Sequence, residues 1–182
     1  MVGGCVIVGV GVGLVLRGRL GSDGYSTAIY GLSGQTRLPY AVVNWAVALV
    51  CVLSAWTRGV RPGVGTIVHP LVVGGTVDIV LQLAPPTTLD ARIITLIAGT
   101  LILSAGVALY LSASLGSGPF ESLALALHPL PFRAAYMILQ AAGTCLGWLL
   151  GAPVGPGTFL IVFGVGPLVA TLRRHIPGTG VA

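Results

Sequence analysis

The stretch Leu115-Gly116-Ser117-Gly118-Pro119-Phe120-Glu121-Ser122 places a glycine-rich turn, a proline and a carboxylate inside an otherwise apolar region of the chain. Proline is favoured at the first position of a helix, where its missing N–H costs nothing. Glycine or serine is suited to the cap position before it. The stretch therefore predicts a turn that leads directly into a short helix, about Phe120–Leu127.

An imperfect second copy lies upstream, at Leu20-Gly21-Ser22-Asp23-Gly24-Tyr25-Ser26-Thr27. The similarity starts before the turns, because Gly11–Leu16 aligns with Gly106–Leu111 and the match runs on without a gap. It resumes further along, where Tyr40 and Asn44 recur as Tyr136 and Gln140, and Gly63-Val64-Gly65-Thr66 recurs as Gly155-Pro156-Gly157-Thr158. Separate matches in the same order indicate an internal duplication.

The duplication divides a single membrane domain, residues 1–182, into two repeats. Residues 1–84 form the first repeat and residues 91–175 the second. The link between them contains Pro85-Pro86 and Thr87-Thr88, so it is polar and breaks helices. Residues 176–182 are mostly small and are predicted to form a flexible tail.

The composition predicts that lipid, rather than water, surrounds most of this chain. Of its 182 residues 55% are hydrophobic and only 7% are charged, whereas a soluble domain carries about 25% charged residues. The net charge of +5 comes from arginines that stand singly or in pairs between apolar runs. Nucleic-acid binding needs a clustered basic face, so we expect the partner of these arginines to be the bilayer surface.

Continuous apolar runs predict six membrane-spanning helices. Such runs favour helices over barrel strands, in which apolar and polar residues alternate. Several runs are shorter than the about 20 residues of an average span, and tilting or local thinning of the bilayer would accommodate them. The runs are Val2–Leu16, Tyr40–Thr57, Gly65–Leu83, Ile93–Ser112, Ala134–Leu150 and Thr158–Leu172.

Two further segments, about Tyr25–Leu32 and Phe120–Leu127, have a helical pattern but are too short to cross. Each follows a glycine turn, so we interpret them as half-helices buried within the protein. Each repeat then crosses three times, and the two repeats have opposite orientations. The predicted fold is an all-α integral membrane protein with about six transmembrane helices in two inverted three-helix repeats.

The distribution of arginines gives a prediction for the orientation. The larger group of arginines falls on the side that holds the C-terminus, and positive residues favour the cytoplasmic side. We therefore predict a multi-pass protein of the cytoplasmic membrane with both termini in the cytoplasm. The larger group is Arg58, Arg61, Arg133, Arg173 and Arg174, and the other is Arg17, Arg19, Arg37 and Arg92.

Glu121 has two interpretations that both stay open. With Gly118 as the helix cap, its carboxylate falls at the third helical position, where it can bond back to the cap amide. Alternatively, a half-helix that starts within the membrane offers N–H donors to an anionic or polar ligand, with Glu121 as counter-charge or proton carrier. Asp23 occupies the cap position of the first copy, and the same two interpretations apply to it.

Polar residues at equivalent places in the two repeats complete the predicted binding site. Asn44 and Gln140 lie in spanning helices and are suited to interhelical hydrogen bonds or to a central cavity. The candidate substrate-binding residues are Gly21, Ser22, Asp23, Asn44, Gly116, Ser117, Gly118, Glu121 and Gln140.

Neither enzymatic chemistry nor a cofactor is expected. Ser117 and Ser122 have no nearby base, and no nucleotide-binding glycine pattern occurs. The His and Cys residues lack metal-ligand spacing, so no metal site is predicted. Glycines spaced four apart, such as Gly143 and Gly147, favour close helix packing, either within the chain or in a homodimer.

The residues of the second repeat resemble a known family. Leu115–Leu123, Gly147-Trp148-Leu149-Leu150-Gly151, Gly155-Pro156-Gly157-Thr158 and Gly166-Pro167-Leu168 are similar to the YczE-like branch of the YczE/YyaS/YitT integral membrane proteins of bacteria. The resemblance implies a small multi-pass protein of the cytoplasmic membrane and brings no established catalytic residues. It departs at Tyr25-Ser26, where the family pattern has an aromatic residue followed by an acid.

The leading functional hypothesis is a transporter or substrate-binding membrane component for a small molecule, with a site where the two half-helices approach. Two alternatives stay open. One is a membrane adaptor that supports a biosynthetic enzyme or complex without transporting. The other is a substrate-capturing subunit of a larger importer.

Overall fold

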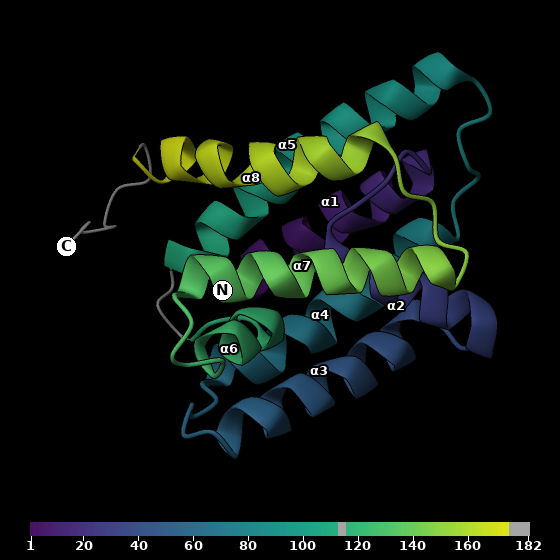
Figure 1. Cartoon of the computed structure of the whole chain (residues 1–182). Coiled ribbons are helices and arrows are strands. Elements are labelled where there is room, and N and C mark those ends of the chain that lie inside the picture. Colours follow the sequence, from purple (N-terminus) through teal and green to yellow (C-terminus); the bar gives the residue numbers. More distant parts are fainter. Residues whose placement is uncertain (113–115, 175–182) are drawn as a thin grey trace.

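Residues 1–112 and 116–174 are described by the computed structural model, and every regular element among them is an α-helix (Figure 1). The prediction of an all-helical chain is confirmed. The tail predicted for residues 176–182 lies outside the described residues. The helices are α1 (Val2–Gly18), α2 (Gly24–Thr36), α3 (Tyr40–Trp56), α4 (Val64–Leu81), α5 (Leu89–Ser112), α6 (Pro119–Leu125), α7 (Phe132–Leu149) and α8 (Pro156–Arg173).

The six long helices follow the predicted apolar runs closely. The largest difference in a starting residue is at α5, which begins at Leu89 rather than Ile93. The short helices also form where they were predicted, although α2 extends further than expected: α2 has 13 residues and α6 has seven. At about 1.5 Å per residue, α2 extends for about 20 Å, still less than the about 30 Å of a bilayer core.

Helix length and surface both fit a membrane environment. Three helices, α4, α5 and α8, are long and apolar enough to cross a bilayer, while α1 and α3 are apolar with 17 residues each. Large apolar side chains cover the outside: Leu49, Trp148, Leu149, Phe159 and Phe163 are all exposed. So many large apolar side chains at the surface are not typical of soluble monomers. The chain is therefore a helical membrane protein.

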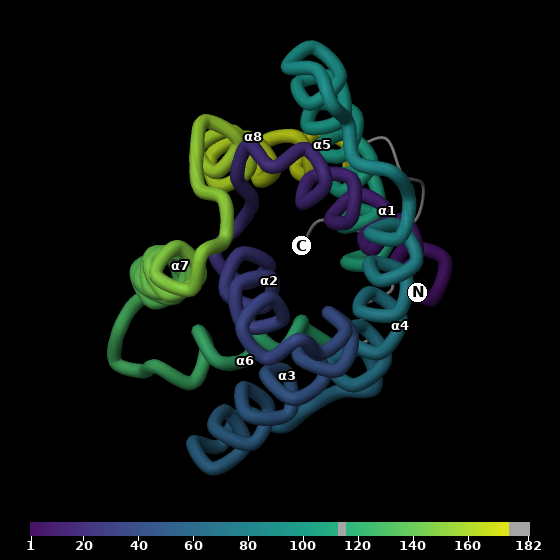
Figure 2. The backbone as a smooth tube through the Cα atoms, turned by 90° about the vertical axis from the view of Figure 1, so that its right-hand side faces the viewer, coloured from purple at the N-terminus to yellow at the C-terminus, as the bar shows by residue number. Residues whose placement is uncertain are grey.

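Figure 2 looks nearly along the helices and shows them grouped around the centre of the molecule. Helix α1 packs against α4 and α5, and α5 also packs against α8. On the other side, α2 packs against α7, and α3 packs against α4 and α6. The short helices α2 and α6 are thus held mainly by long helices from the other half of the chain.

Glycines permit the close approach of α1 and α5. A side-chain carbon on Gly106 would lie 2.5 Å from the Val8 amide nitrogen, and one on Gly99 would lie 2.9 Å from that of Val15. Gly4 and Gly11 make the matching contacts from α1. Small residues at such crossings let backbones touch, which is the main source of helix association in lipid.

Further glycines pack closely within the chain, among them Gly143 and Gly147, which were predicted to favour close packing. Gly9 faces Thr76 of α4, and Gly143 and Gly147 face the backbone of α2 at Gly24 and Thr27. These close contacts occupy the glycine surfaces intramolecularly. A homodimer interface through the same glycines is therefore not needed to explain them.

Asp78 holds the start of α3 from the neighbouring helix α4. Its two carboxylate oxygens accept hydrogen bonds from the amides of Tyr40 (2.9 Å) and Ala41 (3.0 Å). The cap residue of α3 is Pro39, whose side chain makes no cap bond. A carboxylate from α4 therefore supplies the acceptors that a helix start otherwise lacks.

We expect Asp78→Asn to lower the stability of the protein by about 1–2 kcal/mol, since an amide has only one acceptor oxygen and one of the two N–H groups loses its partner. The melting temperature in detergent measures this. Asp90→Asn serves as the control, because Asp90 is exposed in the first turn of α5. Equal melting temperatures for both variants would contradict the capping role.

Candidate functional site

Both glycine turns adopt the backbone conformation that favours glycine. Gly21 has φ +109° and Gly116 has φ +119°, and they occupy equivalent places in the two copies of the motif. Left-handed values of this kind are costly for other residues. The glycines thus reverse the chain just before each short helix begins.

Each turn contacts the start of a long helix from the other half of the chain. At the first turn, the Gly157 amide of α8 donates to the Leu20 carbonyl (2.8 Å). At the second, the Thr66 hydroxyl of α4 donates to the Ser117 carbonyl (2.7 Å) and accepts from the Gly63 amide (3.2 Å). The repeated Gly-x-Gly-Thr sequences therefore have a structural task, which is to seat the turns.

At the start of α2, several backbone amides donate to acceptors from the protein. Asp23 is the cap residue, and its carboxylate accepts from the Ser26 amide (3.0 Å). The Gly24 amide donates to the side-chain oxygen of Gln140 on α7 (2.6 Å), and Gln140 donates in turn to the Tyr136 hydroxyl (2.9 Å). The interpretation of Asp23 as a helix cap is confirmed, and Gln140 joins it there.

The start of α6 follows the predicted pattern. Gly118 is the cap residue, with extended backbone, and Pro119 is in the first turn. The Glu121 carboxylate folds back over Gly118, so closely that a side-chain carbon on Gly118 would collide with its Oε2 atom. Nearby, the hydroxyl groups of Ser117 and Ser122 are 2.9 Å apart. Glu121 therefore lies at the helix start, as the sequence predicts.

A cavity of about 680 Å³ lies between the two short helices, and all eight described helices contribute to its wall. This volume is within the range of small-molecule binding sites. Its wall is mainly apolar, with polar groups at intervals. The polar residues that line it are Asp23, Tyr25, Ser26, Tyr40, Asn44, His69, Tyr110, Ser117, Glu121, Tyr136 and Gln140.

Aromatic rings form a large part of this wall. Tyr25 and Phe120, which are equivalent in the two copies, have ring centroids 5.0 Å apart. Phe120 also meets Tyr136 at 6.1 Å, edge to face. Elsewhere in the cavity His69 lies 4.8 Å from the ring of Tyr110. The Tyr110 hydroxyl donates to the Gly116 carbonyl (2.8 Å), which connects the aromatic wall to the second turn.

The fixed charges of the cavity are both negative. Asp23 and Glu121 line it, and the described lining residues include neither arginine nor lysine. Both residues are half-buried. Asp23 and Glu121 therefore give the cavity its acidic character. His69 contributes an imidazole to the same wall.

Five of the nine predicted site residues come together at this cavity: Asp23, Asn44, Ser117, Glu121 and Gln140. The other four do not line the cavity and belong to the two turns: Gly21, Ser22, Gly116 and Gly118. The Asn44 side chain donates to the Pro70 carbonyl (2.8 Å) and is buried. Asn44 therefore fastens α3 to α4 at the edge of the site.

The aromatic residues of the wall are what the sequence reasoning missed. Tyr25, Phe120, Tyr40 and Tyr136 all sit at repeated positions of the duplicated motifs. Their recurrence in both halves could have indicated the aromatic wall, because residues at repeated positions are expected to lie near the contact between the halves. His69 and Tyr110 carried no comparable signal, since apolar residues align with them.

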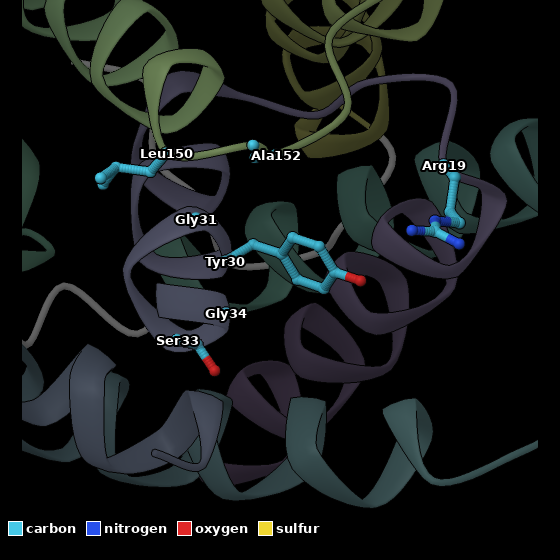
Figure 3. A pocket seen from close by; sticks show the side chains of 8 residues that line it. Arg19, Tyr30, Gly31, Ser33, Gly34, Leu150 and Ala152 are labelled. Atoms are coloured by element: carbon cyan, nitrogen blue, oxygen red, sulfur yellow. The ribbon is translucent and has the colours of Figure 1, made fainter. Parts of the chain in front are cut away.

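A second, smaller pocket of about 330 Å³ lies beside the far end of α2 (Figure 3). Tyr30 extends from α2 toward Arg19, and Leu150 and Ala152 form the opposite rim. Arg19 is exposed, and none of the predicted site residues lines this pocket. The central cavity is therefore the candidate functional site.

Apolar helices, two of them short, around a central and mainly apolar cavity define the class: a helical membrane protein with an internal cavity. The chain belongs to a family described as a family of unknown function (DUF6198), which matches residues 1–174. This membership agrees with the YczE-like resemblance of the sequence.

Three relatives show the same kinship. An uncharacterized protein of Haemophilus influenzae is 32% identical over 170 residues, covering 90% of this chain and 77% of the relative. The uncharacterized membrane protein YczE of Bacillus subtilis is 27% identical over 183 residues, covering 96% and 82%. The uncharacterized protein YyaS of Bacillus subtilis is 24% identical over 169 residues, covering 87% and 83%. No solved structure matches the chain.

Proposed function

We propose that this protein binds a small molecule in the central cavity and carries it across the cytoplasmic membrane. The observation that carries the proposal is the pairing of the cavity wall. Residues at equivalent places in the two halves line it together: Tyr25 with Phe120, Ser26 with Glu121, Tyr40 with Tyr136, and Asn44 with Gln140. A site at the meeting of two repeats is typical of secondary transporters.

The proposal includes two inverted repeats, residues 1–84 and 91–175, with about six membrane crossings. The order of helices supports it, since a long helix, a short helix and two long helices occur in each half. The packing is also reciprocal: α2 packs on α7 and α6 on α3, while α1 packs on α4 and α5 on α8. Such an exchange of partners is the pattern that a two-fold relation between the halves produces.

The contact between α3 and α4 has no counterpart of similar extent in the second half, and it gives the proposal a moving part. In the first half α3 packs along α4, whereas α7 and α8 make at most a marginal contact within the described residues. Alternating access requires the two halves to exchange arrangements. We propose that α7 and α8 approach, and α3 and α4 separate, when the cavity opens to the other side.

The test needs no knowledge of the substrate. Val165 of α8 lines the cavity and is half-buried. The variant Val165→Cys is made in a background without the three native cysteines. We expect this cysteine to react with a membrane-impermeant maleimide added to either side of a proteoliposome. Access from both sides is what a transporter provides and what a static adaptor does not.

Arg58→Cys supplies the matched control, since Arg58 lies exposed in the loop between α3 and α4. We expect it to be labelled from one side only, which also establishes the orientation of the chain. Labelling of Val165→Cys from a single side would refute transport and favour the adaptor. Two-sided labelling that needs a co-purifying subunit would favour the importer component.

A further inference from the structure

We propose that the ligand of the central cavity is an organic ammonium cation with an apolar, aromatic-sized body. This inference rests on the proposed small-molecule function and names its substrate class. Its basis is the combination of two carboxylates, aromatic faces and an unpartnered phenol oxygen in one cavity.

The charge of the wall selects the sign of the ligand. Asp23 and Glu121 enter the cavity from the two opposite half-helices, with no lysine or arginine among its described lining residues to neutralise them. In a water-poor site, opposite charges attract strongly and like charges are rejected. A cation placed between the two short helices would balance both acids, whereas an anion would be repelled.

The helix starts are a weaker site for an anion than for a cation, because the chain's own groups already use part of each. At α2, the amides of Gly24 and Ser26 donate to Gln140 and Asp23. At α6, the first turn contains Pro119, and the Glu121 carboxylate lies over the cap. Oxygens of the chain thus bind two amides of α2, and a carboxylate of the chain lies beside the start of α6. Both carboxylates also line the cavity, where a cation would balance their negative charge.

The aromatic wall fits a cation that carries an apolar body. Tyr25, Phe120 and Tyr136 form a continuous set of ring contacts, and the faces of such rings attract ammonium groups within about 6 Å. The Tyr25 hydroxyl is buried with no hydrogen-bond partner within the described residues. As an acceptor for an ammonium N–H, it would gain the bond that it lacks.

The test compares three probes of similar size: phenethylammonium, the neutral 2-phenylethanol and the anion phenylacetate. Binding to the purified full chain in lipid nanodiscs is measured by calorimetry. We expect the ammonium to bind at least tenfold more tightly than the alcohol, with no detectable binding of the anion. Equal affinities, or no binding of the ammonium at millimolar concentration, would overturn the inference.

Two variants show whether the named groups are responsible. We expect Glu121→Gln to weaken ammonium binding at least tenfold and Tyr25→Phe to weaken it about threefold to tenfold, with the affinity for 2-phenylethanol unchanged in both. Asp90→Asn removes a distant exposed carboxylate and should leave ammonium binding intact. Unchanged ammonium affinity in the Glu121→Gln protein would refute the site.

The two proposals fail in different ways. If Val165→Cys is labelled from both sides but the probes bind alike, transport stands and the substrate class is wrong. If the ammonium binds selectively but labelling is one-sided, the cavity is a cation receptor and not a transport site.

Discussion

Gly11→Val is expected to destabilise the protein by about 3 kcal/mol or more, because its side chain would force α1 away from α5. The first added carbon would lie 2.6 Å from the Leu103 Cα atom, well inside van der Waals contact. Overpacking a dense interior costs about 1–3 kcal/mol, and more when rigid backbone must move. The contact between α1 and α5 is the most extensive of any two described helices, so its disruption is costly.

Gly3→Val is the matched control on the same helix. Gly3 is exposed, and an added side chain there would meet nothing within 4 Å. Both changes put the same β-branched residue into α1, so the difference between them isolates the α1–α5 contact. We expect a fall of about 10 °C in the melting temperature for Gly11→Val and little change for Gly3→Val. Similar melting temperatures would contradict the proposed packing.

The second large effect is expected at the first glycine turn. In Gly21→Ala the new carbon would be held at φ +109° and would lie 2.8 Å from the Thr158 amide nitrogen and 2.9 Å from that of Gly155. The turn would have to leave the start of α8 and take Asp23 with it. We expect a cost of about 3 kcal/mol, made up of backbone strain and the lost contact with α8.

Gly59→Ala separates these two contributions. Gly59 also has a positive φ, of +91°, but a side-chain carbon there would meet nothing within 4 Å. It should therefore show only the backbone strain, about 1–2 kcal/mol. Thermal unfolding of both variants in the same detergent gives the comparison. If Gly21→Ala were no worse than Gly59→Ala, the contact between the turn and α8 would have no energetic value.

Loss of the contact between the first glycine turn and α8 is expected to affect ligand binding as well. Val165 and Ile161 of α8 form part of the cavity wall, so a displaced α8 would leave the cavity open on that side. Gly21→Ala should then weaken phenethylammonium binding even in molecules that remain folded, whereas Gly59→Ala should not.

Much of the fold was open to prediction because it depends on local chemistry. Apolar runs fixed the six long helices to within four residues, since burial in lipid requires continuous hydrophobicity. The Gly118-Pro119 sequence placed the start of α6, because cap and first-turn preferences act over a few residues. The end of α2 was harder to predict. The helix continues past the predicted end at Leu32 to Thr36, although this extension contains Gly34, which disfavours a helix.

The site was predictable in part, and the difference has a physical cause. Asp23 and Glu121 stood out because a charge in an apolar sequence is costly. The aromatic wall did not, because tyrosine and phenylalanine are ordinary in membrane helices and only their meeting makes them a surface. Which acceptor each amide uses, such as Gln140 for Gly24, depends on contacts between residues far apart in the chain.

The sequence by itself determined that this is a helical membrane protein with two glycine turns, each leading into a short helix, since composition and local backbone preference carry that information. Only the tertiary structure decided what the turns do. Each turn contacts a long helix of the other half, and two carboxylates and several aromatic side chains line one cavity. Those relations are long-range contacts, which no local pattern encodes.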